Sequence, residues 1–182
     1  MSAIHEHVLQ NGMTLLCWPQ RHLHGLEFGL YLKGGPLYET EETQGISNLL
    51  EHLCFRGLGG LNREGLLREL NRFGTNLDAA TYAEGLVFRL KCLPRFFDAA
   101  LEYFLRFFAN VPWTPEQIAA EKQVVLRQLE ADGDGDLFDR AACDFRKTEN
   151  GAFPPLGTPE SLMALTEADI HLWQEMIFQP QN

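Results

Sequence analysis

Long apolar runs, basic residues and paired cysteines are all scarce in this chain of 182 residues. No apolar stretch approaches the roughly 20 residues needed to cross a bilayer, so the sequence predicts no membrane span. Only 15 Lys and Arg stand against 25 Asp and Glu, which gives a formal net charge of -10. Because phosphate backbones and anionic lipids are also negative, this charge argues against nucleic-acid binding and membrane-surface roles.

The four cysteines are widely spaced and form no Cys-x-x-Cys pair, which argues against a disulfide framework or a zinc knuckle. We interpret them as buried or half-buried thiols in a reducing compartment: Cys17, Cys54, Cys92 and Cys143. The stretch Met1 to His7 has neither a basic n-region nor an apolar h-region, so no signal peptide is visible. We therefore expect a cytoplasmic location, although a leader already removed is compatible with the periplasm.

The chain does have enough apolar residues for a sizeable core, since 45% are hydrophobic and 11% aromatic. Asn11-Gly12 between two apolar runs predicts a β-hairpin over residues 5–20. Alternation predicts further strands at 26–32, 76–82 and 86–93. Helical spacing and caps predict helices at 44–55, 62–74, 94–110, 114–131 and 137–147, and two short ones from Thr158 and Thr166. This order predicts a single α+β domain, an antiparallel-rich mixed sheet covered on one side by helices.

The sequence Asn48-Leu49-Leu50-Glu51-His52, on the first predicted helix, carries the functional argument. In inverted zinc peptidases, H-x-x-E-H places two histidines on one helical face, where both bind the metal. The glutamate between them takes a proton from the metal-bound water. Here Glu51 and His52 are present, but Asn48 stands at the position of the first histidine.

The surrounding residues resemble the M16 family of zinc peptidases, the group of insulin-degrading enzyme, pitrilysin and the mitochondrial processing peptidase. The stretch from Gly45 to Gly57 is similar to the metal-site helix of that family. The resemblance is collinear over nearly the whole chain and includes Leu9 to Met13, Gly74 to Thr81, Leu156 to Leu162 and Phe178 to Asn182. It implies one M16-type (LuxS-like) domain over residues 1–182. Family domains usually continue with another strand and helix, so we expect the chain to be C-terminally short.

By this resemblance, the third metal ligand of the family falls at Gln128, and Glu121 is the glutamate that supports the site. Two of the three protein ligands, Asn48 and Gln128, are therefore amides instead of imidazole and carboxylate. Amide oxygens are poor zinc donors and carry no charge to neutralise the metal. We therefore expect no cofactor, and Glu51 becomes a vestigial general base without an activated water.

The resemblance also implies a way of binding peptide that needs no metal. Family domains add an extended peptide as a strand to a sheet edge. In this chain the resemblance places that edge at the strand segment Asp78, Ala79, Ala80 and Thr81, next to Glu51 and His52. The leading hypothesis is an inactive M16-type domain that binds extended peptide or pairs with an active M16 subunit or domain, as a homo- or hetero-oligomer.

Three alternatives remain open at this point. In the first, Asn48, His52, Gln128 and water hold zinc weakly, and the chain is a metalloendopeptidase with Glu51 as general base. In the second, His52 binds a metal together with His22 and His24. In the third, the domain is a structural module without a peptide-binding edge.

Overall fold

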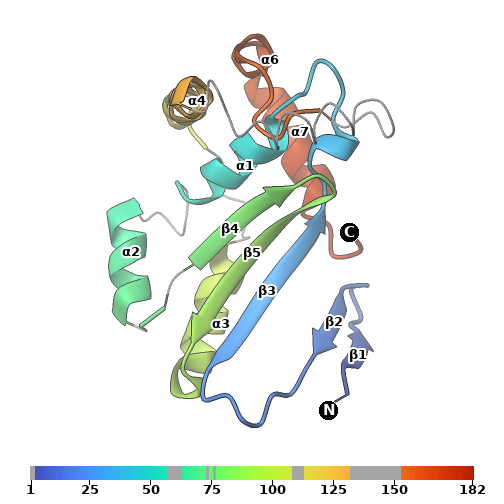
Figure 1. The fold of residues 1–182 in the computed structure, drawn as a ribbon, viewed down its shortest axis with the longest axis vertical. Coiled ribbons are helices and arrows are strands. Elements are labelled where there is room, and N and C mark those ends of the chain that lie inside the picture. The colour runs from blue at the N-terminus through green and yellow to red at the C-terminus, as the bar shows by residue number, and fades with distance from the viewer. Residues whose placement is uncertain (1–2, 57–62, 73, 76, 108–112, 132–152) are drawn as a thin grey trace.

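The computed structural model describes residues 3–56, 63–72, 74–75, 77–107, 113–131 and 153–182 (Figure 1). The helix expected at 137–147 and Cys143 lie outside these residues. Every other element that the sequence predicts is present in the described part, within a few residues of its expected bounds. No helix among the described residues has both the length and the apolar character to cross a membrane.

The described strands form two antiparallel groups. The first is the hairpin of β1 (His5–Val8) and β2 (Thr14–Cys17). The second is a three-stranded sheet in the order β3-β5-β4, built from β3 (Leu26–Lys33), β4 (Leu77–Tyr82) and β5 (Gly85–Cys92). The hairpin lies to the side of β3, and the described strands of the two groups share no pairing (Figure 1).

The helices supply the second layer. Longer helices are α1 (Ile46–Cys54), α2 (Arg63–Arg72), α3 (Phe97–Phe107), α4 (Pro115–Ala131) and α7 (Glu167–Ile177); shorter ones are η1 (Pro36–Tyr38), η3 (Pro94–Phe96) and α6 (Pro159–Ala164). Along β5, Leu86, Phe88 and Leu90 are buried, while the residues between them are more accessible. One face of the sheet therefore packs into the core, as expected for a sheet covered on one side.

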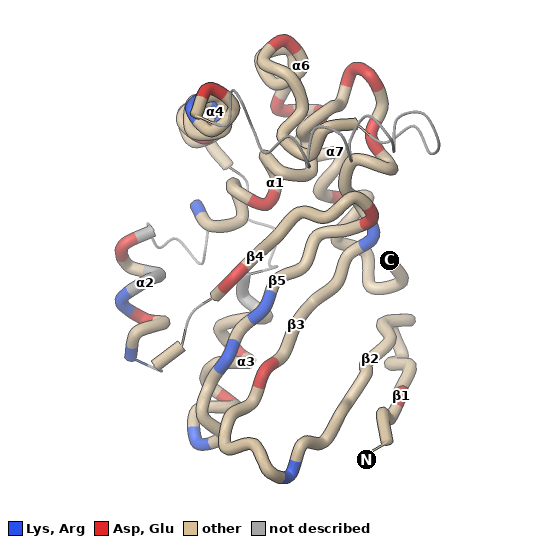
Figure 2. The backbone as a smooth tube through the Cα atoms, viewed as in Figure 1, with Lys and Arg blue, Asp and Glu red and all other residues tan. Residues whose placement is uncertain are grey.

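The other face of the sheet carries charges. Asp78 on β4 lies opposite Arg89 on β5, and Glu27 on β3 lies opposite Lys91, with 3.4 Å between Glu27 Oε2 and Lys91 Nζ. Figure 2 shows these acidic and basic positions alternating across the three strands. Opposite charges on cross-strand neighbours favour this register.

The start of α1 is fixed by a buried carboxylate. Glu39 accepts hydrogen bonds from the backbone N–H groups of Gly45 at 2.8 Å and Ser47 at 3.0 Å. The Ser47 hydroxyl oxygen in turn accepts the backbone N–H of Gly35 at 2.9 Å and the indole N–H of Trp173 at 3.1 Å. These bonds link α1 both to the segment that follows β3, through Gly35, and to α7, through Trp173.

Two glycines allow α1 to approach the segment before α6. Gly45 and Gly157 both have positive φ, 83° and 71°. A Cβ on Gly45 would lie 2.6 Å from the backbone oxygen of Leu156, and one on Gly157 would lie 2.5 Å from that of Gln44. The hydroxyl of Ser161 also donates to Gln44 O at 2.9 Å. Only glycine fits this backbone-to-backbone crossing without strain.

The hairpin differs from the rest of the fold because all eight of its strand residues are exposed. This corrects the expectation for Cys17, which is an exposed free thiol, whereas Cys54 and Cys92 are buried as expected. Because the described hairpin strands share no pairing with β3, Cys17 lacks the cover that its apolar neighbours in the sequence suggested.

Candidate functional site

Helix α1 brings the three motif positions into one region beside α4 and β4. Asn48 and His52 lie four residues apart and therefore on one face of the helix. The Asn48 side chain is buried, and its Oδ1 has no hydrogen-bond partner in the described structure. Glu51 is half-buried, and the His52 side chain is 19% exposed.

Glu51 is tied to the edge strand. The hydroxyl of Thr81 on β4 donates a hydrogen bond to Glu51 Oε2 at 2.5 Å. Burial raises the pKa of Glu51, the Thr81 hydrogen bond and His52 offset part of this rise, and the nearby Asp78 carboxylate adds to it. The structure therefore brings Thr81 and Asp78 of the edge strand close to Glu51.

His52 faces Glu121 on α4. His52 Nδ1 lies 3.2 Å from Glu121 Oε1, and because a carboxylate oxygen only accepts, Nδ1 carries the proton of this bond. The guanidinium of Arg56, one turn further along the chain, donates through Nε to Glu121 Oε2. Burial opposes ionisation of Glu121, but the bonds from His52 and Arg56 outweigh it and lower the pKa of Glu121. A carboxylate that orients a histidine in this way is typical of the outer shell of a metal site.

Gln128 is exposed on α4, seven residues after Glu121. Seven residues make about two turns, a rise of about 10 Å, so the two residues lie on the same face of the helix. Among the described contacts, the imidazole of His52 is bonded to Glu121. No group of three or more His, Cys, Asp or Glu side chains in the described residues is arranged to hold a metal. The donor set at this position, one imidazole and two neutral amides, does not fit zinc.

The strand β4 forms an edge of the sheet in the described structure. It pairs with β5 on one side, and the described strands provide no partner on the other. Asp78 is exposed, and Ala79, Ala80 and Thr81 are half-buried. Helix α1 packs beside this strand, so the edge runs past Glu51 (Figure 1).

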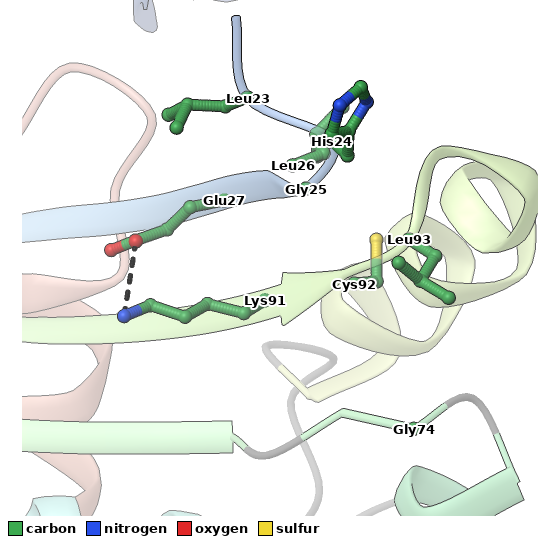
Figure 3. Close-up of a pocket in the computed structure, with 9 residues that line it drawn as sticks. All are labelled: Leu23, His24, Gly25, Leu26, Glu27, Gly74, Lys91, Cys92 and Leu93. Carbon is green, nitrogen blue, oxygen red and sulfur yellow. Dashed lines mark ion pairs between the residues drawn. The ribbon is translucent and has the colours of Figure 1, made fainter.

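His22 and His24 lie in the connection before β3, at the opposite end of the sheet from α1 (Figure 1). His24 lines an open pocket of about 420 Å³ there, together with Cys92, Leu93 and the Glu27–Lys91 ion pair (Figure 3). His52 does not line this pocket, and the described structure groups neither histidine with His52 in a metal-ligating cluster.

Two contacts of the site were missed by sequence reasoning, namely the bond from Arg56 to Glu121 and the bond from Thr81 to Glu51. The spacing gave a partial signal for the first, because Arg56 follows His52 by four residues and so shares its helical face. The second joins residues 30 apart in sequence, which no local pattern indicates.

Comparison with known proteins identifies the family of this chain. The family model described as Insulinase (Peptidase family M16) matches residues 24–143, about two thirds of the chain. The chain belongs to the M16 peptidase family. It is 28% identical over 162 residues to an uncharacterized zinc protease of Rickettsia felis, covering 87% of this chain and 39% of that protein. It is 26% identical over 145 residues to the beta subunit of the mitochondrial processing peptidase of Caenorhabditis elegans, covering 78% and 32%.

Solved structures share the fold. A protease from Helicobacter pylori superposes with a TM-score of 0.87 at 22% identity, over 100% of this chain and 45% of that one. A peptidase M16 inactive domain from Pseudomonas fluorescens superposes with a TM-score of 0.81 at 16% identity, over 94% and 43%. These likenesses confirm the predicted M16-type α+β fold. The chain spans less than half the length of each of these four proteins.

Proposed function

We propose that this chain is a non-catalytic M16 domain that binds extended peptide or pairs with an active M16 subunit or domain. The observation that carries the proposal is the donor set around His52. Asn48 and Gln128 are amides, and the remaining histidine is engaged by Glu121. Zinc in a peptidase site needs three good protein donors before it acidifies its bound water. Without that water, Glu51 has no proton to take.

The surroundings of Glu51 support a structural role for its side chain. It accepts the Thr81 hydroxyl, and burial raises its pKa. The bond to Oε2 links α1 to the strand proposed to receive peptide.

The edge strand β4 supports peptide binding by strand addition. Backbone groups on its outer side have no partner among the described strands, and such an edge pairs readily with an extended segment. The net charge of -10 favours a basic peptide over an acidic one. Asp78, exposed on this strand, adds a local negative charge.

The pairing with another subunit is supported by the relatives. One of them is the beta subunit of a mitochondrial processing peptidase, and a solved structure that superposes on this chain is that of an inactive M16 domain. An inactive domain contributes to such an assembly through its surfaces and needs no metal of its own.

A second candidate is a zinc endopeptidase with a weak metal site, favoured by the retention of Glu51, His52 and the supporting Glu121. The two candidates differ in metal occupancy. We would therefore measure zinc in the purified chain after incubation with zinc and desalting, in a His5→Ala/His7→Ala/Cys17→Ser background that removes exposed donors elsewhere. The matched variant adds Asn48→His and Gln128→Glu.

We expect less than 0.1 zinc per chain in the background protein and about one in the variant with restored ligands, because two good donors have been supplied. A stoichiometric zinc in the background protein would overturn the proposal and make peptidase assays the next step. An empty restored variant would show that Gln128 is not at the ligand position.

The peptide edge has its own test. Residues three apart on a strand point their N–H groups to opposite sides, so only one of Asp78→Pro and Thr81→Pro removes an outward donor. We expect that variant to bind a fluorescent, extended basic peptide at least tenfold more weakly, with an unchanged circular dichroism spectrum. Unchanged affinity in both variants would favour a module without a peptide-binding edge.

A further inference from the structure

The open pocket of about 420 Å³ lies at the opposite end of the sheet from α1 (Figure 3). The connection before β3 supplies Leu23 and His24 on one side, and the end of β5 supplies Cys92 and Leu93 on the other. Pockets that bind small molecules range from about 300 to 1,000 Å³. This pocket therefore has room for a compact organic molecule.

The walls of the pocket are mostly apolar. The side chain of Leu23 is 56% exposed and that of Leu93 is 44% exposed, while Leu26 is half-buried. Cys92 is buried and directs its sulfur atom toward Leu26 and His24 (Figure 3). Because removal of such apolar surface from water is favourable, these walls favour a ligand with a hydrocarbon part.

The rim of the pocket offers cationic groups, although the chain as a whole is acidic. Lys91 lines the pocket, and Arg21 and Arg95 each lie two residues from a leucine of its wall. The Lys91 ammonium is paired with Glu27 at 3.4 Å, but its side chain is 74% exposed. An ammonium group has three N–H donors, so it can also bind a carboxylate from a ligand.

Two glycines line the pocket and leave space at its opening. A Cβ on Gly25 would meet only the backbone oxygen of Cys92, at 4.0 Å, and one on Gly74 would meet no described atom within 4 Å. Gly25 does not have a positive φ. A larger side chain at Gly25 is therefore compatible with the backbone and would occupy space in the pocket.

We propose that this pocket binds a small carboxylate with an apolar chain, of about the size of octanoate. The chain lies against Leu23, Leu26 and Leu93, and the carboxylate accepts hydrogen bonds from the Lys91 ammonium and from a ring N–H of His24. Bonds between an ammonium and a carboxylate are stronger than bonds between neutral groups. The combination of apolar walls and a cationic rim selects this class of ligand.

This site does not rest on the proposed function. None of the residues that line it belongs to α1, α4 or β4. Failure of octanoate to bind would therefore leave the tests of the zinc position and of the peptide edge unaffected. Failure of either of those tests would likewise leave this pocket unaffected.

The test is an NMR titration of the backbone amides of the full chain with octanoate, at low ionic strength. We expect one octanoate per chain, with the largest shifts at residues 23–27 and 91–93. The Kd should be low-millimolar or tighter, which is typical of a ligand with roughly ten non-hydrogen atoms. Octanamide keeps the chain without the charge, and acetate keeps the charge without the chain. Each should bind at least tenfold more weakly.

The variants test the two parts of the site separately. Lys91→Gln should weaken octanoate binding at least fivefold and reduce its dependence on salt. The matched control is Lys33→Gln, the same change at an exposed lysine of the same sheet outside the pocket, which should leave the affinity unchanged. Gly25→Leu should abolish binding because its side chain fills the pocket, with an unchanged circular dichroism spectrum.

Three outcomes would overturn the proposal. The first is equal affinity for octanoate and octanamide, or unchanged octanoate binding in Lys91→Gln. The second is a set of shifts centred on the exposed β1–β2 hairpin, which would indicate unspecific apolar contact. The third is binding of N-acetyl-leucyl-leucine without binding of octanoate, which would assign the pocket to the C-terminus of a peptide and not to a small carboxylate.

Discussion

The contact between α1 and α4 and the β1–β2 hairpin are opposite in composition and in burial. The first holds the residues of a peptidase motif in a half-buried setting, with the side chain of Glu121 only 5% exposed. There, however, the amides Asn48 and Gln128 stand where the family resemblance implies metal donors. The second holds a thiol and two imidazoles on an element whose strand residues are all exposed. The more buried region therefore combines close packing with few good zinc donors, whereas the exposed hairpin carries such donors without close packing.

This difference indicates that the packing of the motif helix α1 does not depend on metal donors on its polar face. Leu49, Leu50 and Leu53 on α1 are fully buried, so this helix serves the core whatever its polar face does. The Arg56–Glu121–His52 network links the same helix to α4. Packing and charge pairing therefore maintain α1, and neither requires a bound metal.

The largest effect is expected from comparing one leucine in each region. Leu49→Ala should lower the free energy of unfolding by about 2–5 kcal/mol, because it leaves a cavity in the core. Leu16→Ala on the hairpin, where the side chain is 65% exposed, should change it by at most about 0.5 kcal/mol. Urea unfolding measures both. Equal losses would contradict the contrast between the two regions.

The second largest effect on stability is expected from the network of Arg56, Glu121 and His52. Glu121→Ala should lower the free energy of unfolding by about 2–4 kcal/mol, because His52 and Arg56 lose their carboxylate partner. The loss is smaller than for a fully buried ion pair because the Arg56 side chain is partly exposed. The matched control is Glu64→Ala, which removes an exposed pair with Arg68 and should cost less than about 0.5 kcal/mol. A small loss at Glu121 would indicate that packing alone holds α1 against α4.

The same network predicts that the free energy of unfolding depends on pH. The pKa of Glu121 is lower in the folded state than its ordinary value of 4.5. The ionised carboxylate therefore contributes fully to stability above about pH 4.5. The contribution is lost as the pH falls through the folded pKa. The difference in unfolding free energy between the parent and Glu121→Gln should therefore shrink below about pH 4.5. A difference independent of pH would rule out this ionic contribution.

The smallest effect concerns the link between α1 and the edge strand. Thr81→Val removes the hydroxyl that lowers the pKa of Glu51, so this pKa should rise further above its ordinary value. Carbon-detected NMR titration of the Glu51 carboxyl group measures it. Thr81→Ser, which keeps a hydroxyl, is the control. A pKa of Glu51 unchanged by Thr81→Val would show that burial alone sets it.

The sequence predicted most of the fold because its signals are local. Asn11-Gly12 marked the hairpin, and the reciprocal bonds between Thr114 and Gln117 confirm the expected cap of α4. The sequence of α3 is apolar most of the way round, yet Leu105 is 60% exposed while Ala100 and Phe104 are buried. Composition indicates how apolar a helix is, but only the position of its neighbours decides which side is covered.

The candidate site was predictable in part. The motif spacing placed Asn48, Glu51 and His52 together, and the resemblance supplied Glu121. The bond between Thr81 and Glu51 and the exposure of Gln128 depend on how α1, α4 and β4 pack, which one sequence does not reveal. The roles of Gln128 and of the edge strand remain predictions.

The crossing of Gly45 and Gly157 has a consequence for how the chain folds. The hydroxyl contact beside it joins Ser161 to Gln44, 117 residues apart in sequence. The start of α1 therefore acquires its final surroundings only after most of the chain has been brought back to it, at an entropic cost that grows slowly with loop length. Contacts of such long range slow folding. We therefore expect the α1–α6 junction to be among the last parts of the domain to become ordered.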